Sequence, residues 1–200
     1  EHDSLATEAD QNLRTALFFA RRDERGQVVL VTGTAPQEGK TTTIVNLARL
    51  LAGYERSHAP DQRLGADRGL LGIVVALFHD AGYIRQTDDT VHRNGAEFTR
   101  THVGRSARFL ARYLPTIGMA EWVPVATQIV HFTGYELKFD QIRLDDPRDR
   151  KVGHLIGTAD MVAQMADRCY LEKCRDRLYP ELVLGGVAVS RGNEGELNVA

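Results

Sequence analysis

The sequence has few cysteines, only Cys169 and Cys174 in 200 residues. They lie five positions apart in a stretch with strong helical character, so on a helix they point to different sides. That spacing matches neither a pair of zinc ligands nor a redox motif. We therefore expect two reduced thiols and no disulfide framework, as in a cytoplasmic protein.

The sequence also lacks long apolar runs and a strong charge of either sign. The longest apolar run, Leu70–Phe78, is too short to cross a bilayer, so no membrane span is expected. No charged and then apolar leader opens the chain, which favours a cytoplasmic location. The net charge of -2 predicts no general binding of nucleic acid or anionic membrane. With 42% hydrophobic and 26% charged residues, the composition is that of a folded, soluble protein.

Two patterns follow one another along the chain. The first 53 residues predict a helix over Glu8–Ala20, a buried strand over Val28–Val31 and a helix over Thr41–Tyr54. From residue 54 to 189 the pattern is almost entirely helical, and residues 190–200 read as a flexible tail. The predicted helices of this second part are Leu70–Ala81, Ala96–Leu114, Ala120–Phe132 and Lys151–Leu178. We thus predict a mainly α fold preceded by a partial strand–loop–helix segment.

The loop between the predicted strand and the helix at residue 41 has the composition of a phosphate-binding loop. The general pattern is G-x-x-x-x-G-K-[ST]; here Thr34 replaces the first glycine, and Gly39, Lys40 and Thr41 complete the pattern. Backbone N–H groups near Gly39 could cradle phosphates, with Lys40 on the terminal phosphates and Thr41 on Mg²⁺. The pattern therefore predicts Mg-ATP as a ligand, although this segment could also serve only as packing.

Residues 8–52 resemble the opening of bacterial tyrosine autokinases and related partitioning ATPases. The resemblance rests on EADQNLRTALFFA and on VLVTGTAPQEGKTTTIVNLARLLA. It implies a P-loop ATP-binding module. The module is incomplete, since no apolar strand ending in the acidic residue of a Walker B motif follows it, and GIVVALFHD is better explained as a helix.

A second set of polar residues has the chemistry of metal ligands. The adjacent His79 and Asp80 follow an apolar helical run, and His102, His131 and Asp160 follow at gaps of 23, 29 and 29 residues. Each gap is roughly one helix and one turn, so separate helices could each deliver one ligand to a common point. Imidazole and carboxylate together suit Fe, Mn, Zn or Co, as one or two ions. The alternatives are local hydrogen bonds for the pair and core histidines for the others.

Residues 54–189 resemble the HD superfamily of metal-dependent phosphohydrolases, most specifically in LFHDAGY and GTADMVAQMADR. His79, Asp80 and Asp160 match the metal ligands of that family, and His102 and His131 resemble the further histidines of its two-metal members. The resemblance implies an HD-like helical bundle and hydrolysis of a phosphate ester or nucleotide by metal-activated water. The upstream histidine of the family is absent, with His58 as the nearby candidate.

Three functions remain open from the sequence. The first is an HD-type phosphohydrolase acting on a phosphorylated small molecule or nucleotide, in which no catalytic residue beyond the metal ligands can be assigned. The second is a P-loop ATP-binding module related to the autokinases. The third is an HD fold that serves as a non-catalytic binding or scaffold protein. The sequence does not determine the oligomeric state.

Overall fold

The computed structural model describes residues 15–20, 26–31 and 40–189, with side chains from residue 42 onward. The chain forms two compact units. Unit 1 contains the described residues up to Leu77 and Arg143–Gln164, and unit 2 contains Phe78–Ile142 and the described residues from Met165 onward. Both units are built from separate stretches of the sequence. The predicted division between residues 53 and 54 stays a prediction, and the tail beyond residue 189 lies outside the described residues.

A two-stranded antiparallel hairpin precedes the helices of unit 1. Strand β1 (Thr15–Ala20) pairs with β2 (Gly26–Val31), with Thr15 opposite Val31 and Ala20 opposite Gly26. The strand predicted at residues 28–31 is confirmed. The helix predicted over residues 8–20 is wrong for residues 15–20, and residues 8–14 lie outside the described part. The threonine and two phenylalanines of TALFFA favour strand, and pairing with GQVVLV outweighs the helical spacing of its leucine and alanines.

Three helices make up the rest of unit 1: α2 (Lys40–Ser57), α3 (Ala66–Phe78) and α6 (Pro147–Met165). The predicted helix at 41–54 is confirmed, and α2 continues through residues 53 and 54. Helices α3 and α6 approach closely at Gly72, where a Cβ would lie 3.1 Å from a methyl of Val152. The buried apolar side chains of unit 1 are Ile44, Leu47, Leu51, Leu64, Leu71, Ile73, Val74, Val75, Ala76, Val152, Ile156 and Ala159.

A buried ion pair fastens α3 to the beginning of α6. The Arg68 guanidinium donates to Asp149 Oδ1 at 2.7 Å and to Asp146 Oδ2 at 2.7 Å. The Asp149 side chain is 9% exposed and that of Arg68 18%. Asp146 also accepts from the backbone N–H and guanidinium of Arg148, whose hydrogen bonds hold the pKa of Asp146 at about 2. The local sequence pattern does not reveal this pair, because its members lie about 80 positions apart along the chain.

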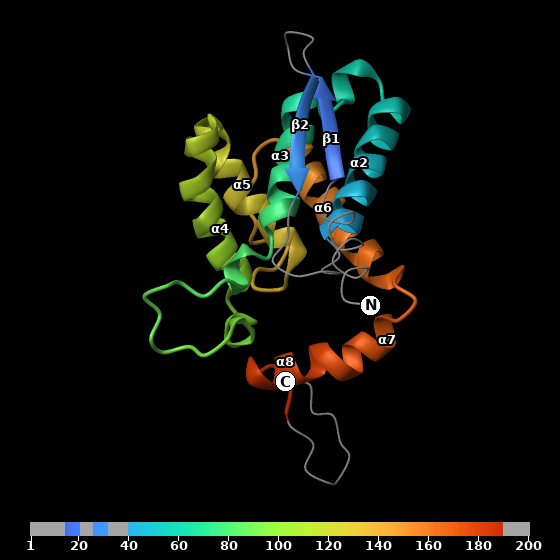
Figure 1. The fold of residues 1–200 in the computed structure, drawn as a ribbon. Helices are drawn as coiled ribbons and strands as arrows, with labels where there is room; N and C mark the ends of the chain where they lie inside the picture. Colours follow the sequence, from blue (N-terminus) through green and yellow to red (C-terminus); the bar gives the residue numbers. More distant parts are fainter. Residues whose placement is uncertain (1–14, 21–25, 32–39, 190–200) are drawn as a thin grey trace. The chain divides into compact units, whose positions relative to one another are not determined.

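Unit 2 is centred on α4 (His102–Tyr113), which packs along α5 (Val123–Ile129) (Figure 1). Short 3₁₀ turns surround them: η2 (Ala81–Tyr83), η3 (Gly95–Phe98), η4 (Leu114–Ile117), η5 (Ala120–Trp122) and η6 (Val130–Thr133). The helices predicted at 96–114 and 120–132 are therefore present but shorter, each with 3₁₀ turns at its ends. The buried apolar side chains are Phe98, Val103, Ala107, Leu110, Leu114, Met119, Ala126, Ile129, Val130, Phe132 and Ile142.

The single helix predicted over residues 151–178 is wrong, because the chain leaves the helix after Met165. Asp167 accepts a hydrogen bond from the backbone N–H of Cys169 at 2.9 Å, a local turn that competes with helix. The remaining segment consists of α7 (Tyr170–Lys173), a π-helical turn (η7, Cys174–Leu178) and α8 (Tyr179–Leu184).

The prediction of a mainly α fold is confirmed, since helices make up most of the described chain. The finer prediction, an HD-like arrangement of those helices, stays a prediction. None of the helices in the described residues combines the length and apolarity of a membrane span.

Replacing Arg68 by alanine should destabilise the protein by about 3 kcal/mol, because it leaves the buried Asp149 carboxylate without its partner. Equilibrium urea unfolding of the intact chain, followed by far-UV circular dichroism, measures this change. The control is Arg148→Ala, whose side chain is 45% exposed and also binds Asp146. Its removal should cost less than about 1 kcal/mol. Equal losses in the two variants would contradict the central role of the Arg68–Asp149 pair.

Candidate metal centre

The predicted His-Asp pair lies in a turn and not on a helix. Helix α3 ends at Phe78, His79 and Asp80 follow, and η2 begins at Ala81. The prediction of a helix through residue 81 is thus wrong at its C-terminal end. Asp80 has φ -98° and ψ 5°, which ends the helical hydrogen-bond pattern. The rings of Phe78, Phe109 and Tyr113 pack together, with centroids 4.8–5.5 Å apart, and so hold the start of this turn against α4.

Ser106 on α4 joins the turn at His79–Gly82 to this helix through buried hydrogen bonds. Its hydroxyl is fully buried, accepts a hydrogen bond from the Gly82 N–H at 2.8 Å and lies 2.5 Å from the His79 carbonyl oxygen, to which it can donate. The approach is so close that a Cβ on Gly82 would lie 1.8 Å from the His102 carbonyl oxygen. Only glycine fits there, so the identity of residue 82 fixes how near the turn comes to α4.

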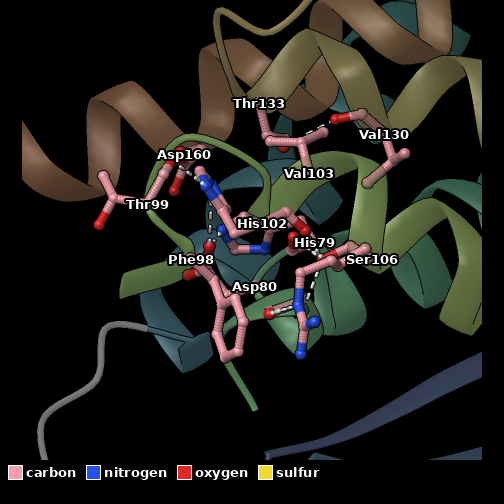
Figure 2. Close-up of polar contacts among 12 residues, drawn as sticks. His79, Asp80, Phe98, Thr99, His102, Val103, Ser106, Val130, Thr133 and Asp160 are labelled. Carbon is pink, nitrogen blue, oxygen red and sulfur yellow. Dashed lines mark hydrogen bonds and ion pairs between the residues drawn. The ribbon is translucent and has the colours of Figure 1, made fainter. Parts of the chain in front are cut away.

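His102, the first residue of α4, faces this turn. Its Nδ1 lies 2.8 Å from the Thr99 carbonyl oxygen, and its Nε2 lies 4.0 Å from Asp80 Oδ1. His79 Nε2 is 3.2 Å from the other Asp80 oxygen. Both histidines are buried, whereas the Asp80 side chain is 44% exposed. The structure therefore brings His79, Asp80 and His102 together beside solvent (Figure 2).

Tyr83 covers the His102 imidazole. The two rings stack with centroids 4.2 Å apart and planes 18° apart. Burial, together with the negative charge of Asp80, raises the pKa of Tyr83 to about 12. The phenol therefore keeps its proton at neutral pH.

His131 lies in η6, and its Nδ1 is buried without a hydrogen-bond partner in the described structure. Burial lowers the pKa of His131, opposed by the nearby Glu136 carboxylate. Glu136 itself accepts from the Val103 N–H at 2.7 Å and the Gly104 N–H at 2.8 Å, at the N-terminus of α4. Its Oε1 is 4.0 Å from His102 Nδ1. A carboxylate at this helix end is favoured by the helix dipole.

The other predicted site residues belong to unit 1. Asp160 lies on α6 in unit 1, where it is half-buried and accepts a hydrogen bond from Gln164 at 3.2 Å. Of the phosphate-loop residues, Gly39 lies outside the described residues. Lys40 and Thr41 form the first turn of α2, and their side chains also lie outside the described part. His58, the candidate for an upstream ligand, stacks on Tyr54 in unit 1.

The ligand atoms of the cluster meet some of the geometric requirements of a divalent metal ion but not all of them. Ligands of Fe, Mn, Zn or Co lie about 2.0–2.2 Å from the ion, so two ligands of one ion lie at most about 4.4 Å apart. The separation of His102 Nε2 and Asp80 Oδ1 satisfies this limit. However, within the described residues no group of three or more His, Cys, Asp or Glu side chains is arranged to hold a metal ion. The side chains as placed therefore form an incomplete coordination sphere.

The sequence analysis missed the residues that hold the cluster in place: Gly82, Tyr83, Thr99, Ser106 and Glu136. One of them could have been found. Ser106 lies three positions after Val103 and four before Leu110, and so it is a small polar residue on the apolar face of α4. The others act through the backbone or through contacts that are distant in sequence, which a helical pattern does not reveal.

Comparison with known proteins gives one distant similarity. The chain is 29% identical over 178 aligned residues to the "Putative tyrosine-protein kinase AmsA" of Erwinia amylovora, which covers 80% of this chain. The chain spans about a fifth (22%) of the length of that relative. No protein-family model matches the chain, and no solved structure does. The similarity supports the resemblance to tyrosine kinases, and the resemblance to the HD superfamily stays a prediction.

Replacing Ser106 by alanine should cost about 1–3 kcal/mol of stability, because it leaves the buried Gly82 N–H without an acceptor. Urea unfolding measures the loss, and hydrogen exchange of the Gly82 amide should become faster at the same time. Thr116→Ala is the control, since its exposed hydroxyl donates only to the Tyr113 carbonyl in its own turn. An unchanged Gly82 amide in the Ser106 variant would mean that the turn is held by other contacts.

Proposed function

We propose that unit 2 carries an HD-type metal site and that the protein is a metal-dependent phosphohydrolase acting on a phosphate ester or nucleotide. The observation that supports this is the relation of His102 to Asp80. A carbonyl oxygen can only accept, so the proton on a neutral His102 lies on Nδ1, toward Thr99. The bare Nε2 then faces a carboxylate oxygen across 4.0 Å. Two electron-rich atoms in this position repel each other, and a cation between them removes the repulsion.

The residues have distinct roles in this proposal. Asp80, partly exposed, would bind the ion at the solvent side, while the buried His79 and His102 would bind it from the protein side. His131, in the same unit, is the candidate for completing this site or forming a second, and the role of Asp160 stays a prediction from the sequence. When bound, a divalent ion supplies an activated water for attack on phosphorus. The Thr99 carbonyl orients His102, as hydrogen-bond partners commonly do for metal-binding histidines.

Metal content per chain tests the proposal directly. The purified protein, supplied with Fe, Mn, Zn or Co and then dialysed, should retain a near-stoichiometric ion, and Asp80→Ala should lower the affinity at least about tenfold. Asp88→Ala, which removes an exposed carboxylate from the loop after η2, should leave it unchanged. If neither the wild-type chain nor the variants retain metal, the site is absent, and a non-catalytic binding or scaffold role is favoured.

A second proposal concerns the N-terminal segment. We propose that Gly39, Lys40 and Thr41 bind the phosphates of Mg-ATP at the start of α2. The similarity to a putative tyrosine-protein kinase supports it. So does the helix that begins at Lys40, because a helix N-terminus attracts phosphate.

Lys40→Ala should abolish or weaken saturable Mg-ATP binding, because it removes the positive charge that meets the terminal phosphates. Equilibrium dialysis with labelled ATP gives the affinity, and Lys138→Ala, an exposed lysine of unit 2, serves as the charge-matched control. Failure of the wild-type chain to bind ATP would exclude this function. The metal site would be unaffected by that result, because its residues lie in unit 2.

A further inference from the structure

The Thr99 carbonyl and the Tyr83 ring contact His102 from different directions. The carbonyl oxygen lies 2.8 Å from Nδ1, in the direction of the ring edge. The Tyr83 ring lies parallel to the imidazole at 4.2 Å and covers its face. The first contact fixes which nitrogen carries the proton, and the second fixes the plane of the ring.

Thr99 and Tyr83 each have a further contact close to His102. Thr99 Oγ1 donates to the Ala96 carbonyl at 2.5 Å, which holds Thr99 against η3. The Tyr83 carbonyl oxygen lies against Gly95, where a Cβ would come within 2.5 Å of it. Tyr83 and Thr99 therefore contact His102 from closely packed backbone.

The end of α8, far away in the sequence, supports the same residues. A Cβ on Gly185 would lie 2.7 Å from Thr99 Oγ1 and 2.7 Å from the Ala96 carbonyl oxygen, so the chain packs directly on this turn. The Arg100 guanidinium donates to the Gly186 carbonyl. Thr99 is thus fixed from the side of η3 and from the C-terminal segment, both within unit 2.

We propose that Tyr83 and Thr99 form a clamp that positions His102 so that Nδ1 carries the proton and the bare Nε2 points to Asp80. The clamp prepares His102 as a ligand before any ion binds. Its relevance to metal binding rests on the proposed function, but its effect on the imidazole does not. Tyr83 and Thr99 are positioning residues, and neither is assigned a contact with the ion.

The state of the His102 ring in the metal-free, full-length protein tests the clamp. Nitrogen NMR of the imidazoles, with His102 assigned by its loss in His102→Gln, should show a single tautomer with the proton on Nδ1. Tyr83→Leu removes the stacked ring and should give a mixture of tautomers. Tyr83→Phe keeps the stacked ring without the hydroxyl and should leave the tautomer as in the wild type. An unchanged His102 spectrum in a folded Tyr83→Leu variant would overturn the proposal.

Phe139→Leu is the matched control, since this aromatic side chain is 58% exposed on the same unit. It should leave the His102 spectrum as in the wild type, and an equal change in this variant would also overturn the clamp. Thr99→Val removes the hydroxyl with little change in volume. It removes the hydrogen bond to the Ala96 carbonyl that holds Thr99 and should give a mixture of tautomers, whereas a wild-type spectrum in this variant would remove the Thr99 side chain from the clamp.

Titration with Co²⁺ alone separates the clamp from the proposed function. If the wild type binds Co²⁺, Tyr83→Leu should weaken binding about tenfold, the range found when a histidine ligand loses its supporting contacts. A tautomer change in Tyr83→Leu without Co²⁺ binding in the wild type would support the clamp and exclude the metal site. Equal Co²⁺ affinity in both proteins with an unchanged tautomer would overturn the clamp and leave the metal site standing.

Discussion

The buried hydroxyl of Ser106 joins the turn after α3 to the first turns of α4. It accepts from the Gly82 N–H and lies within hydrogen-bonding distance of the His79 and His102 carbonyl oxygens. Because Gly82 has no side chain, the backbone of the turn can approach the backbone of α4 directly. Every other contact of the cluster depends on this approach, since His79 and Asp80 lie on one side of it and His102 on the other. A larger residue at position 82 or 106 would move the turn away from α4 and so separate His79 from His102.

Two carboxylates of the described chain outside the His79–Asp80–His102 cluster have their charge matched locally. The carboxylate of Asp149 is neutralised by Arg68, and that of Glu136 lies on the backbone N–H groups at the start of α4. Arg105, which the helical spacing places on a basic face with Arg108 and Arg112, donates to the Gly82 and Ile84 carbonyls and lies over the Phe98 ring. Through these contacts Arg105 holds the turn that contains Gly82 against α4. The Asp80–His102 contact differs, because the two side chains face each other across 4.0 Å, beyond hydrogen-bonding distance.

The two proposed functions concern different parts of the chain and do not exclude each other. The phosphate-loop residues precede α2, whereas the cluster lies in unit 2. The similarity to the putative kinase covers 80% of the chain, which is more than the N-terminal quarter where the phosphate loop lies. It therefore extends into the helical region, in which the sequence pattern resembles a different family.

The local sequence pattern was sufficient to predict helices in the regions of residues 40–57, 66–78, 102–113 and 147–165. Each of these helices buries an apolar face with the helical period. It also identified His79, Asp80 and His102 as polar residues in apolar surroundings. It was insufficient for residues 15–20, where pairing with a second strand decides between strand and helix. It also missed the break after Met165, which depends on the side chain of Asp167 bonding to the backbone.

The sequence by itself therefore determined the helical class, most helix positions and the chemical types of the candidate ligands. Those properties follow from the periodicity and chemistry of neighbouring residues. Only the tertiary structure decided that Gly82 must approach α4, that the Thr99 carbonyl lies beside His102 Nδ1 and that Tyr83 covers the His102 ring. These contacts join residues that are distant along the chain, and their distances are set by backbone packing. No local pattern carries that information.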